Sequence, residues 1–397
     1  MATPIFCCGF ECGVASASAA STHIPTTSSA GSFSTTTVRT GLRSRRLNPS
    51  AVTSEELAPS LGIPTVAVGR IYFYIATNPT ANALIFGGRT ASIRYGGIGF
   101  QSSDSTWRAV ALDGTTYTFG ATGLTLATAT WHYADIRLNV AANPWVVDVT
   151  FNGTNSDTVS PAIAATTVAT IARGDPNSKT FDIYFDDLIA SVTSADYPIG
   201  AGKVLSYIPN ADGTHNIAGA NDFERTLTGT DITNATTTAY QLIDDRPLES
   251  AAGDFINGIA PPNATDYVEW LYEDSVEANA PRTVEAIFGH HDAGGAGTNN
   301  FTVTLRRNDT GATSNIFTGT TNVGATLTWK RAHFATAPGG AAWTTAIFND
   351  LRSRFLVTDA SPDPYIDGIM LEAEFSGAAP PAGVPDPVLR TLMGVGV

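Results

Sequence analysis

Short runs in which apolar and polar residues alternate recur along the chain and constrain its fold more than any other feature. In TFDIYFDDLIAS (180–191), an aromatic or aliphatic side chain occupies every second position from Phe181 to Phe185. Such period-2 alternation is typical of a strand with one buried face. If the alternation continues, Asp187 lies on the apolar face. A carboxylate there must be paired, hydrogen-bonded or bound to a cation, because burying it bare is very costly.

Similar runs fill both halves of the sequence, and residues of turns separate them. The clearest are 65–77, 131–140, 144–152, 266–274, 282–290, 300–308, 326–334 and 364–375. Only 343–355 has the spacing of an amphipathic helix. Short strands at regular spacing are typical of sandwiches and jelly rolls. We therefore predict an all-β chain with two β-sandwich (jelly-roll) domains joined by a long irregular connector.

The domain boundaries follow from where the strand pattern stops and resumes. A chain of 397 residues is too long for one typical domain. We expect a jelly-roll sandwich over 1–200, a polar irregular connector over 201–262 and a smaller sandwich over 263–376. The Pro/Gly-rich segment 377–397 is predicted to be a tail.

Net charge and the lengths of the apolar runs limit the classes of partner that the chain can bind. The formal net charge of −14 argues against nucleic acid, since phosphate binding needs clustered Lys and Arg. The one basic cluster, Arg39 to Arg46, is predicted to be a solvated face or a contact with an acidic neighbouring subunit. No apolar run approaches the ~20 residues that span a bilayer, and we identify no secretory leader. We therefore expect no membrane partner and synthesis in a cytoplasm.

The cysteines lie together at the start of the sequence, at Cys7, Cys8 and Cys12. An odd, clustered set makes no disulfide framework. We expect buried small side chains in a first strand, in which Phe6, Cys8 and Phe10 share a face. Metal binding and an inter-chain disulfide remain as alternatives.

Candidate catalytic groups are few. Glu372 and Glu374 have the spacing of a carboxylate pair on one strand face, but that face lies opposite Leu371 and Phe375 and is predicted to be solvated. His290 and His291, followed by Asp292, are predicted to end a strand at the solvent, because adjacent side chains of a strand point to opposite faces; a metal site is the alternative. No nucleophile elbow, P-loop or dinucleotide motif is present in the sequence. The prediction is that the chain is not an enzyme.

Two residues are candidates for a structural cation. Glu11 follows the first predicted strand, and Asp187 lies in the strand at 180–191. If those strands pair, the two carboxylates could share a Ca²⁺ ion, which prefers oxygen ligands. The alternative is that Asp187 accepts hydrogen bonds from backbone amides in a turn.

Tryptophans are the other ligand-binding candidates, because a solvent-facing indole stacks on sugar rings. The candidates are Trp107, Trp145, Trp270 and Trp343. Tryptophans of sandwiches more often lie in the core, and the sequence does not separate the two roles.

Two stretches carry a resemblance to a known family. The Gly9-Phe10-Glu11 opening and the FDIYFDDLIAS strand (181–191) resemble the concanavalin A-like or laminin G-like sandwich of bacteriophage structural proteins. The segment YPIGAGKVLSYIPNADGTHN (197–216) and the final IDGIMLEAEF (366–375) resemble the parts of those proteins that follow the sandwich. Strands with Phe-Asp-Asp also occur in carbohydrate-binding modules.

The resemblance implies a non-enzymatic component of a tailed-phage virion, in the capsid surface or the tail, assembled in the host cytoplasm. Its partners would be other virion proteins and further copies of the chain, with a host surface glycan as a further candidate. The alternative is a secreted carbohydrate-binding module or a sandwich-fold glycoside hydrolase.

Overall fold

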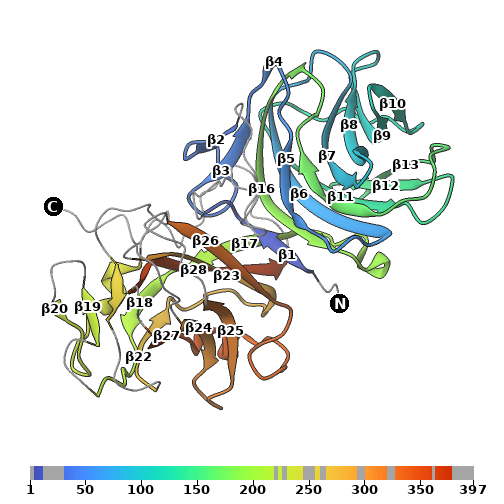
Figure 1. Cartoon of the computed structure of the whole chain (residues 1–397). Helices are drawn as coiled ribbons and strands as arrows, with labels where there is room; N and C mark the ends of the chain where they lie inside the picture. The colour runs from blue at the N-terminus through green and yellow to red at the C-terminus, as the bar shows by residue number, and fades with distance from the viewer. Residues whose placement is uncertain are drawn as a thin grey trace. The chain divides into compact units, whose positions relative to one another are not determined.

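The computed structural model describes residues 4–11, 31–218, 222–225, 230–244, 255–259, 265–292, 300–319, 327–359 and 363–377. Almost every regular element is a β-strand, and the strands form stacked sheets (Figure 1), so the predicted all-β sandwich fold is confirmed. The described residues up to Leu205 and from Glu374 onward form one compact unit, and Ser206 to Ala373 lie in a second. Among the described residues, no helix is long and apolar enough to cross a membrane.

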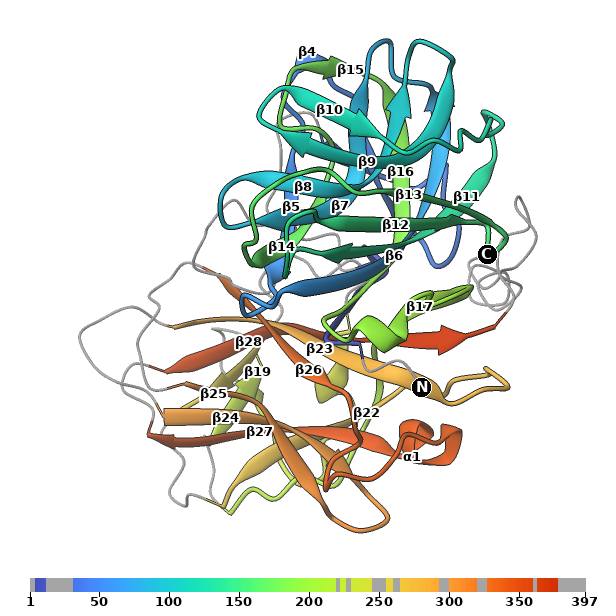
Figure 2. The same ribbon diagram turned by 90° about the vertical axis from the view of Figure 1, so that its right-hand side faces the viewer.

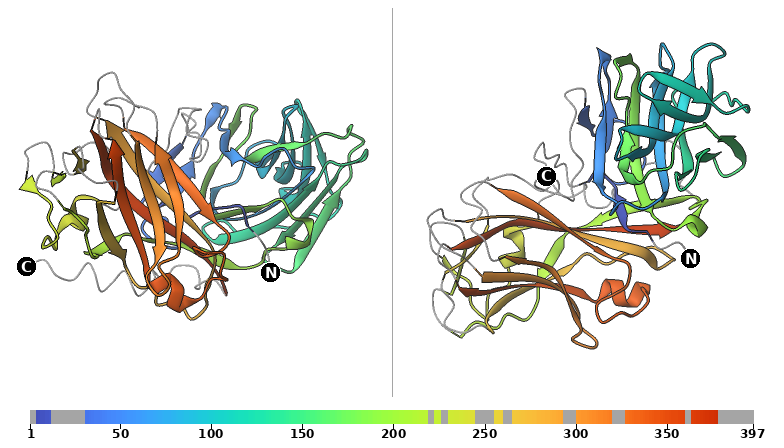
Figure 3. Two further views of the ribbon diagram at one scale, coloured as in Figure 1. Left: turned by 60° about the horizontal axis from the view of Figure 1, so that its bottom comes forward. Right: turned by 45° about the vertical axis from the view of Figure 1, so that its right-hand side comes forward.

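The first unit is a sandwich of two large antiparallel sheets, seen from further sides in Figures 2 and 3. The larger sheet has the order β13-β12-β11-β6-β16-β3-β2, with β1 also paired to β16; the other has the order β10-β9-β8-β7-β14-β5; and β15 pairs with β4. The bounds are β1 Phe6–Cys8, β2 Gly31–Ser34, β3 Ser44–Leu47, β4 Ser50–Val52, β5 Glu56–Ser60, β6 Val66–Thr77, β7 Ala83–Thr90, β8 Arg94–Gln101, β9 Thr106–Asp113, β10 Thr116–Phe119, β11 Trp131–Asn139, β12 Val146–Phe151, β13 Asn155–Val159, β14 Val168–Arg173, β15 Lys179–Thr180 and β16 Asp182–Ser191.

The core of this unit lies between the two large sheets. Alternate residues of β6, from Ala67 to Ile75, enter it with the apolar residues of β11 and β12. Phe6, Cys8 and Phe10 join the same cluster, as the alternation at the start of the sequence predicts. Cys7 is also buried, and it lies in a smaller cluster with Val68 and Val204.

Strand β16 departs from the predicted alternation at Asp187. The register against β6 shifts between Asp186 and Ile189, and Asp187 has a φ of 50°. A bulge of this kind reverses the faces of the following residues. Leu188 therefore enters the core between the sheets, whereas Ile189 packs in the smaller cluster with Cys7. The prediction that Asp187 shares a face with Phe185 is wrong for this reason.

The second unit contains two sheets that lie as separate layers in Figures 1 and 2. One has the order β20-β19-β21-β28-β23-β26, and the other has the order β18-β22-β27-β24-β25. β17 pairs with β28, and Gly202 to Leu205 of β17 and Glu374 to Ser376 of β28 belong to the first unit. The bounds are β17 Gly202–Tyr207, β18 Pro209–Asp212, β19 Phe223–Arg225, β20 Thr230–Asp231, β21 Ile256–Gly258, β22 Tyr267–Tyr272, β23 Pro281–Asp292, β24 Asn300–Arg307, β25 Thr313–Gly319, β26 Thr328–Phe334, β27 Leu351–Asp359 and β28 Pro364–Ser376.

Two sequence predictions differ from the structure in this unit. The segment 201–262, expected to be an irregular connector, supplies β17 to β21 to both sheets. These strands are only two to six residues long, so each is too short to show a clear apolar alternation in the sequence. The helix expected over 343–355 is only α1, Thr345–Asn349, and the remaining residues from Leu351 onward form β27. Cys12 and most of the predicted tail, 378–397, lie outside the described residues.

His290 lies in the core of the second unit rather than at a solvent-facing strand end. It is fully buried, and its ring centroid lies 5.6, 5.3 and 5.0 Å from those of Phe288, Phe301 and Phe317. Neither ring nitrogen has a hydrogen-bond partner among the described residues. Burial, with smaller contributions from Lys330 and His291, lowers the pKa of His290 to about 3.

This histidine predicts a loss of stability in acid. The unfolded chain takes up the proton below about pH 6.5 and the folded chain only near pH 3, so the contribution of His290 is complete above pH 6.5 and is lost as the pH falls. At pH 5 the expected loss is about 2 kcal/mol. His290→Phe should remove this part of the pH dependence when unfolding by urea is compared at pH 7.5 and 5. An unchanged difference between the two pH values in the variant would contradict the prediction.

Candidate functional site

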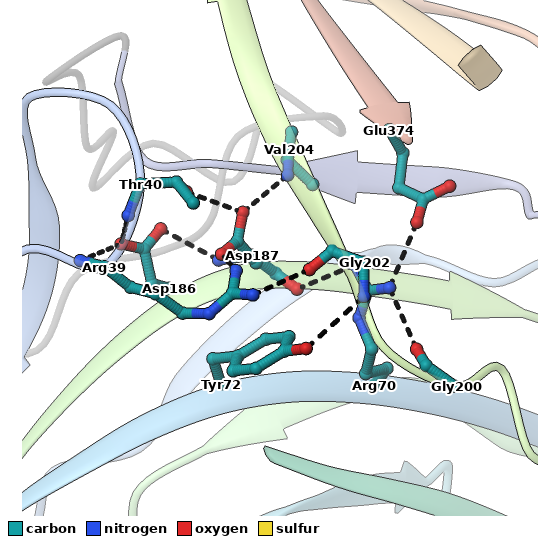
Figure 4. A network of polar contacts seen from close by, with 10 residues as sticks. All are labelled: Arg39, Thr40, Arg70, Tyr72, Asp186, Asp187, Gly200, Gly202, Val204 and Glu374. Carbon is teal, nitrogen blue, oxygen red and sulfur yellow. Dashed lines mark hydrogen bonds and ion pairs between the residues drawn. The ribbon is translucent and has the colours of Figure 1, made fainter. Parts of the chain in front are cut away.

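A buried network of charges lies on the outer face of the larger sheet of the first unit (Figure 4). The Asp187 carboxylate forms an ion pair with Arg39, whose Nη2 also donates to the Gly202 carbonyl over 3.0 Å. Thr40 Oγ1 donates to Asp187 Oδ1 over 2.9 Å, and the Val204 amide donates to the same oxygen. The positive φ of Asp187 turns its carboxylate toward these donors.

The neighbouring Asp186 is held by backbone amides. Its carboxyl accepts from the amides of Arg39, Thr40 and Asp187 over 3.1, 3.4 and 2.9 Å. Complete burial, and then the nearby carboxylates of Asp187 and Glu11, raise the pKa of Asp186 well above its usual value. The two adjacent aspartates therefore organise the loop that carries Arg39.

Arg70 extends the network along β6. Its Nη1 donates to Glu374 Oε1 over 3.0 Å and to the Gly200 carbonyl over 3.1 Å, and both charged side chains are fully buried. Burial is the largest single effect and would lower the pKa of Arg70, but Glu374, Tyr72, Asp187 and Asp135 together outweigh it and raise that pKa. Glu374 therefore lies buried beside a cation, and the prediction that Glu372 and Glu374 form a solvated face is wrong for both, since Glu372 is equally buried against Arg331.

Glu11 lies close to this network but is occupied by other donors. Its carboxylate accepts from the amides of Leu42 and Arg43 over 2.8 and 3.1 Å. Gly41, with a φ of 66°, permits this approach, because a Cβ at that position would overlap the carboxylate. β1 and β16 do pair, as the cation hypothesis requires.

The donors around the two predicted cation ligands do not resemble a metal site. Asp187 faces a guanidinium, a hydroxyl and an amide, and Glu11 accepts hydrogen bonds from two amides. Among the residues that the structure describes, no group of three or more His, Cys, Asp or Glu side chains is arranged to hold a metal ion. This geometry favours the alternative, in which Asp187 is satisfied by donors of the chain itself.

Beyond the network, the same sheet face carries a row of aromatic side chains, which we call the aromatic row: Trp131, Tyr133, Tyr72, Tyr74 and Tyr184. Strand pairing aligns Trp131 with Tyr74 and Tyr74 with Tyr184, across β11, β6 and β16. The ring centroids are 5.7 Å apart for Trp131 and Tyr74 and 5.8 Å apart for Tyr74 and Tyr184. All three rings are half-buried, so each presents part of its surface to solvent.

The inner end of the aromatic row rests on the charged network. Tyr72 pairs in register with Tyr133, and their centroids are 5.0 Å apart. The Arg39 guanidinium carbon lies 3.3 Å from the centroid of Tyr72, a cation–π contact. The Gly202 amide donates to the Tyr72 hydroxyl over 3.3 Å. The network thus fixes the buried tyrosine on which the half-buried Tyr133 packs.

A polar pair borders the outer end of the row. Arg46 on β3 donates to both oxygens of Asp182 over 2.8 and 2.7 Å, and its guanidinium carbon lies 5.3 Å from the centroid of Tyr184. The Arg46 side chain is 34% exposed and that of Asp182 is 17% exposed. Hydrogen-bonding groups therefore lie at the edge of an aromatic surface.

The basic cluster in the sequence has mainly internal partners. Arg39 pairs with Asp187, Arg45 with Glu56 over 2.5 Å, and Arg46 with Asp182. Burial alone would raise the pKa of Glu56, but Arg173 and Arg45 outweigh it and lower that pKa. Three of the four arginines in this cluster therefore form ion pairs within the unit, and the Arg46 side chain is still 34% exposed.

The tryptophans chosen from the sequence as stacking candidates lie in the cores instead. Trp107, Trp145 and Trp270 are fully buried, and Trp343 is 8% exposed. Trp131 was not among the candidates, although its alternation with His132 and Ala134 in WHYADIRLNV places it on the outer face. What the sequence lacked was the strand order that brings Trp131, Tyr74 and Tyr184 into one row.

Comparison with known proteins gives likeness of fold alone. No protein-family model and no curated protein matches the sequence. Matching solved structures include a Trypanosoma rangeli sialidase, at 8% identity over 38% of this chain and 25% of that chain, with a TM-score of 0.28. Domain 4 of an extracellular GH43 arabinanase from Geobacillus stearothermophilus matches at 16% identity over 41% of this chain and 75% of that chain, with a TM-score of 0.30. A CBM22 tandem from Paenibacillus barcinonensis matches at 9% identity over 93% of this chain and 97% of that chain, with a TM-score of 0.26.

The chain spans about a quarter of the length of the sialidase that it matches. The three structures named are at most 16% identical to this chain with TM-scores of at most 0.30, so the likeness is one of fold alone. The prediction that the chain is not an enzyme is contradicted, because sialidases and GH43 glycoside hydrolases are among the matching structures. That prediction is withdrawn.

The network predicts a large cost for removing its central cation. Arg39→Ala leaves Asp187 buried without its guanidinium, which should destabilise the first unit by about 3–5 kcal/mol. The double variant Arg39→Met with Asp187→Asn should lose less, because no unpaired charge remains and Asn tolerates a positive φ. Chemical unfolding of the two variants measures the difference. Equal losses would show that the ion pair is not the interaction that matters.

The donor geometry also predicts the response to calcium. Because protein donors already meet Glu11 and Asp187, we expect the melting temperature to change by less than about 1 °C between EDTA and millimolar CaCl₂. Differential scanning calorimetry measures this directly. A calcium-dependent rise that disappears in Asp187→Asn would instead establish the structural ion suggested by the sequence.

Proposed function

We propose that the first unit binds carbohydrate through the aromatic row. The observation that carries the proposal is the alignment of Trp131, Tyr74 and Tyr184 on adjacent strands, where they are half-buried and bordered by a polar pair. Aromatic side chains are costly to leave in contact with water, and three in register on an outer sheet face suit a ligand with apolar faces.

The chemistry of a sugar chain suits both parts of this surface. The C–H faces of a pyranose or furanose ring stack on aromatic rings, while its hydroxyls need donors and acceptors at the rim. Asp182 supplies acceptor oxygens, and Arg46 supplies N–H donors beside Tyr184. Binding sites of this kind combine aromatic lining with a few placed polar groups.

The network beneath the row supports the proposal by limiting side-chain freedom. Tyr72 is fixed by Arg39 and by the Gly202 amide, and Tyr133 packs on Tyr72. Rings already held in place lose less conformational entropy when a ligand binds.

The broader biological setting stays a prediction. The proposal agrees with the alternative stated from the sequence, a carbohydrate-binding module or a sandwich-fold glycoside hydrolase. A virion protein that attaches to host glycans would use the same surface. The virion location suggested by the family resemblance is tested by mass spectrometry of purified particles, and the other virion subunits and the homo-oligomer stay predictions.

The proposal predicts that truncating the row weakens binding without unfolding the unit. Trp131→Ala and Tyr74→Ala should each reduce affinity about 10-fold or more, since the lost stacking is worth roughly 1.4 kcal/mol. Affinity electrophoresis in gels that contain soluble glucan, xylan, arabinan or mannan gives the measurement. Released reducing sugar in the same samples shows whether binding is followed by cleavage.

Phe119→Ala is the matched control, because Phe119 is a half-buried aromatic residue on β10 of the other sheet. It should bind like the unaltered chain. If no polysaccharide retards the protein, or if Phe119→Ala weakens binding as much as Trp131→Ala, the aromatic row is not the binding surface.

A further inference from the structure

The second unit carries an unusual concentration of positive charge, which we call the arginine cluster: Arg306, Arg352 and Arg354, around Glu269. Arg352 Nη1 donates to Glu269 Oε1 over 3.0 Å, and Arg354 Nε donates to Oε2 over 2.5 Å. Arg306 Nη1 lies further away, 3.7 Å from the same Oε2. These residues come from β22, β27 and β24, neighbours in the five-stranded sheet.

Three guanidinium groups exceed what one carboxylate neutralises. Burial alone would raise the pKa of Glu269, but Arg354 and Arg352 outweigh it and lower that pKa, so the carboxylate is ionised. One negative charge against three positive charges leaves a local excess of two positive charges, in a chain whose net charge is −14. The arginine side chains are 17%, 17% and 21% exposed, whereas Glu269 is 1% exposed.

Polar atoms around the cluster also lack partners. Arg352 Nε and Thr304 Oγ1 are buried without a hydrogen-bond partner among the described residues. Strand register places Thr304 beside Arg354, and Arg306 beside both Arg352 and Thr313. Buried polar atoms in folded proteins are nearly always hydrogen-bonded, so unpartnered ones beside surplus cations point to a ligand.

We propose that the arginine cluster binds the carboxylate or sulfate groups of an anionic polysaccharide. Guanidinium groups present paired N–H donors that match the oxygens of such groups. Arg352 and Arg354 both donate hydrogen bonds to the Glu269 carboxylate, whereas Arg306 lies 3.7 Å from it. Arg306 is therefore the arginine of the cluster with the weakest contact to Glu269 and the most able to bind a ligand.

The surroundings favour a glycan over nucleic acid. Tyr267 lies under Arg354, whose guanidinium carbon is 3.8 Å from the ring centroid, and the exposed Thr313 adds a hydroxyl that suits sugar hydroxyls. A single cluster gives no track of cations along a phosphate backbone. At physiological ionic strength the Debye length is about 8 Å, so the distant carboxylates of this acidic chain do not prevent the approach of an anion.

The test compares two substitutions of equal charge on one strand. Arg306→Gln removes the least committed donor while the two short hydrogen bonds to Glu269 remain. Arg307→Gln is the control, because Arg307 alternates with Arg306 along β24 and pairs with Asp309 over 2.5 Å. Binding of the full chain to polygalacturonate, chondroitin sulfate and uncharged dextran is measured by isothermal titration calorimetry at two salt concentrations.

We expect binding to one or both anionic polymers, none to dextran, and weaker binding at higher salt. Arg306→Gln should weaken it at least 10-fold and Arg307→Gln less than 2-fold; the polymer that binds identifies carboxylate or sulfate as the recognised group. No binding to either anionic polymer, or equal losses in the two variants, overturns the proposal. Trp131→Ala should leave this binding unchanged, which separates its failure from that of the aromatic row.

Discussion

The ion pair between Arg39 and Asp187 is the interaction on which the first unit most depends. It joins the loop before β3 to the bulge of β16, and Arg39 also holds the carbonyl of Gly202 in β17. Removing one partner of a buried ion pair destabilises a protein far more than replacing both partners by apolar residues, because it leaves an unpaired buried charge. Segments that are distant in sequence are therefore fixed together by one guanidinium.

The bulge at Asp187 shows how a local irregularity serves a wider arrangement. A regular strand would have sent this carboxylate toward the apolar core, where no donor could meet it. One inserted residue turns Asp187 to the outer face, and Leu188 takes its place in the core. The αL conformation is costly for most residues but tolerated by Asp and Asn. The small free-energy cost of the αL backbone conformation at Asp187 thus avoids the much larger cost of burying its carboxylate without a partner.

Alternation in the sequence was enough to predict the sandwich fold, and the pairing of β1 with β16, which the cation hypothesis assumed, is present in the structure. It was not enough for the charged residues, because a strand pattern shows which residues share a face but not what covers that face. Glu374 alternates with apolar residues like a solvated side chain, yet Arg70, some 300 residues earlier in the chain, covers it. The expectation that His290 faces solvent was wrong for the same reason, and the sequence left open whether the four candidate tryptophans lie in the core or on the surface. Trp131 and Tyr74 became a candidate site only when strand order was known.

The low content of charged residues determines which interactions can supply affinity at the two proposed surfaces. Only 15% of the residues are charged, and several of the arginines lie inside ion pairs, so much of the surface has little electrostatic attraction for a ligand. On the aromatic row, affinity must then come from stacking and from side chains that are already fixed. In the arginine cluster, affinity would instead come from electrostatic attraction, because three arginines surround the single carboxylate of Glu269. The aromatic row therefore suits an uncharged polymer and should be insensitive to salt, whereas the arginine cluster suits an acidic polymer and should respond to salt strongly.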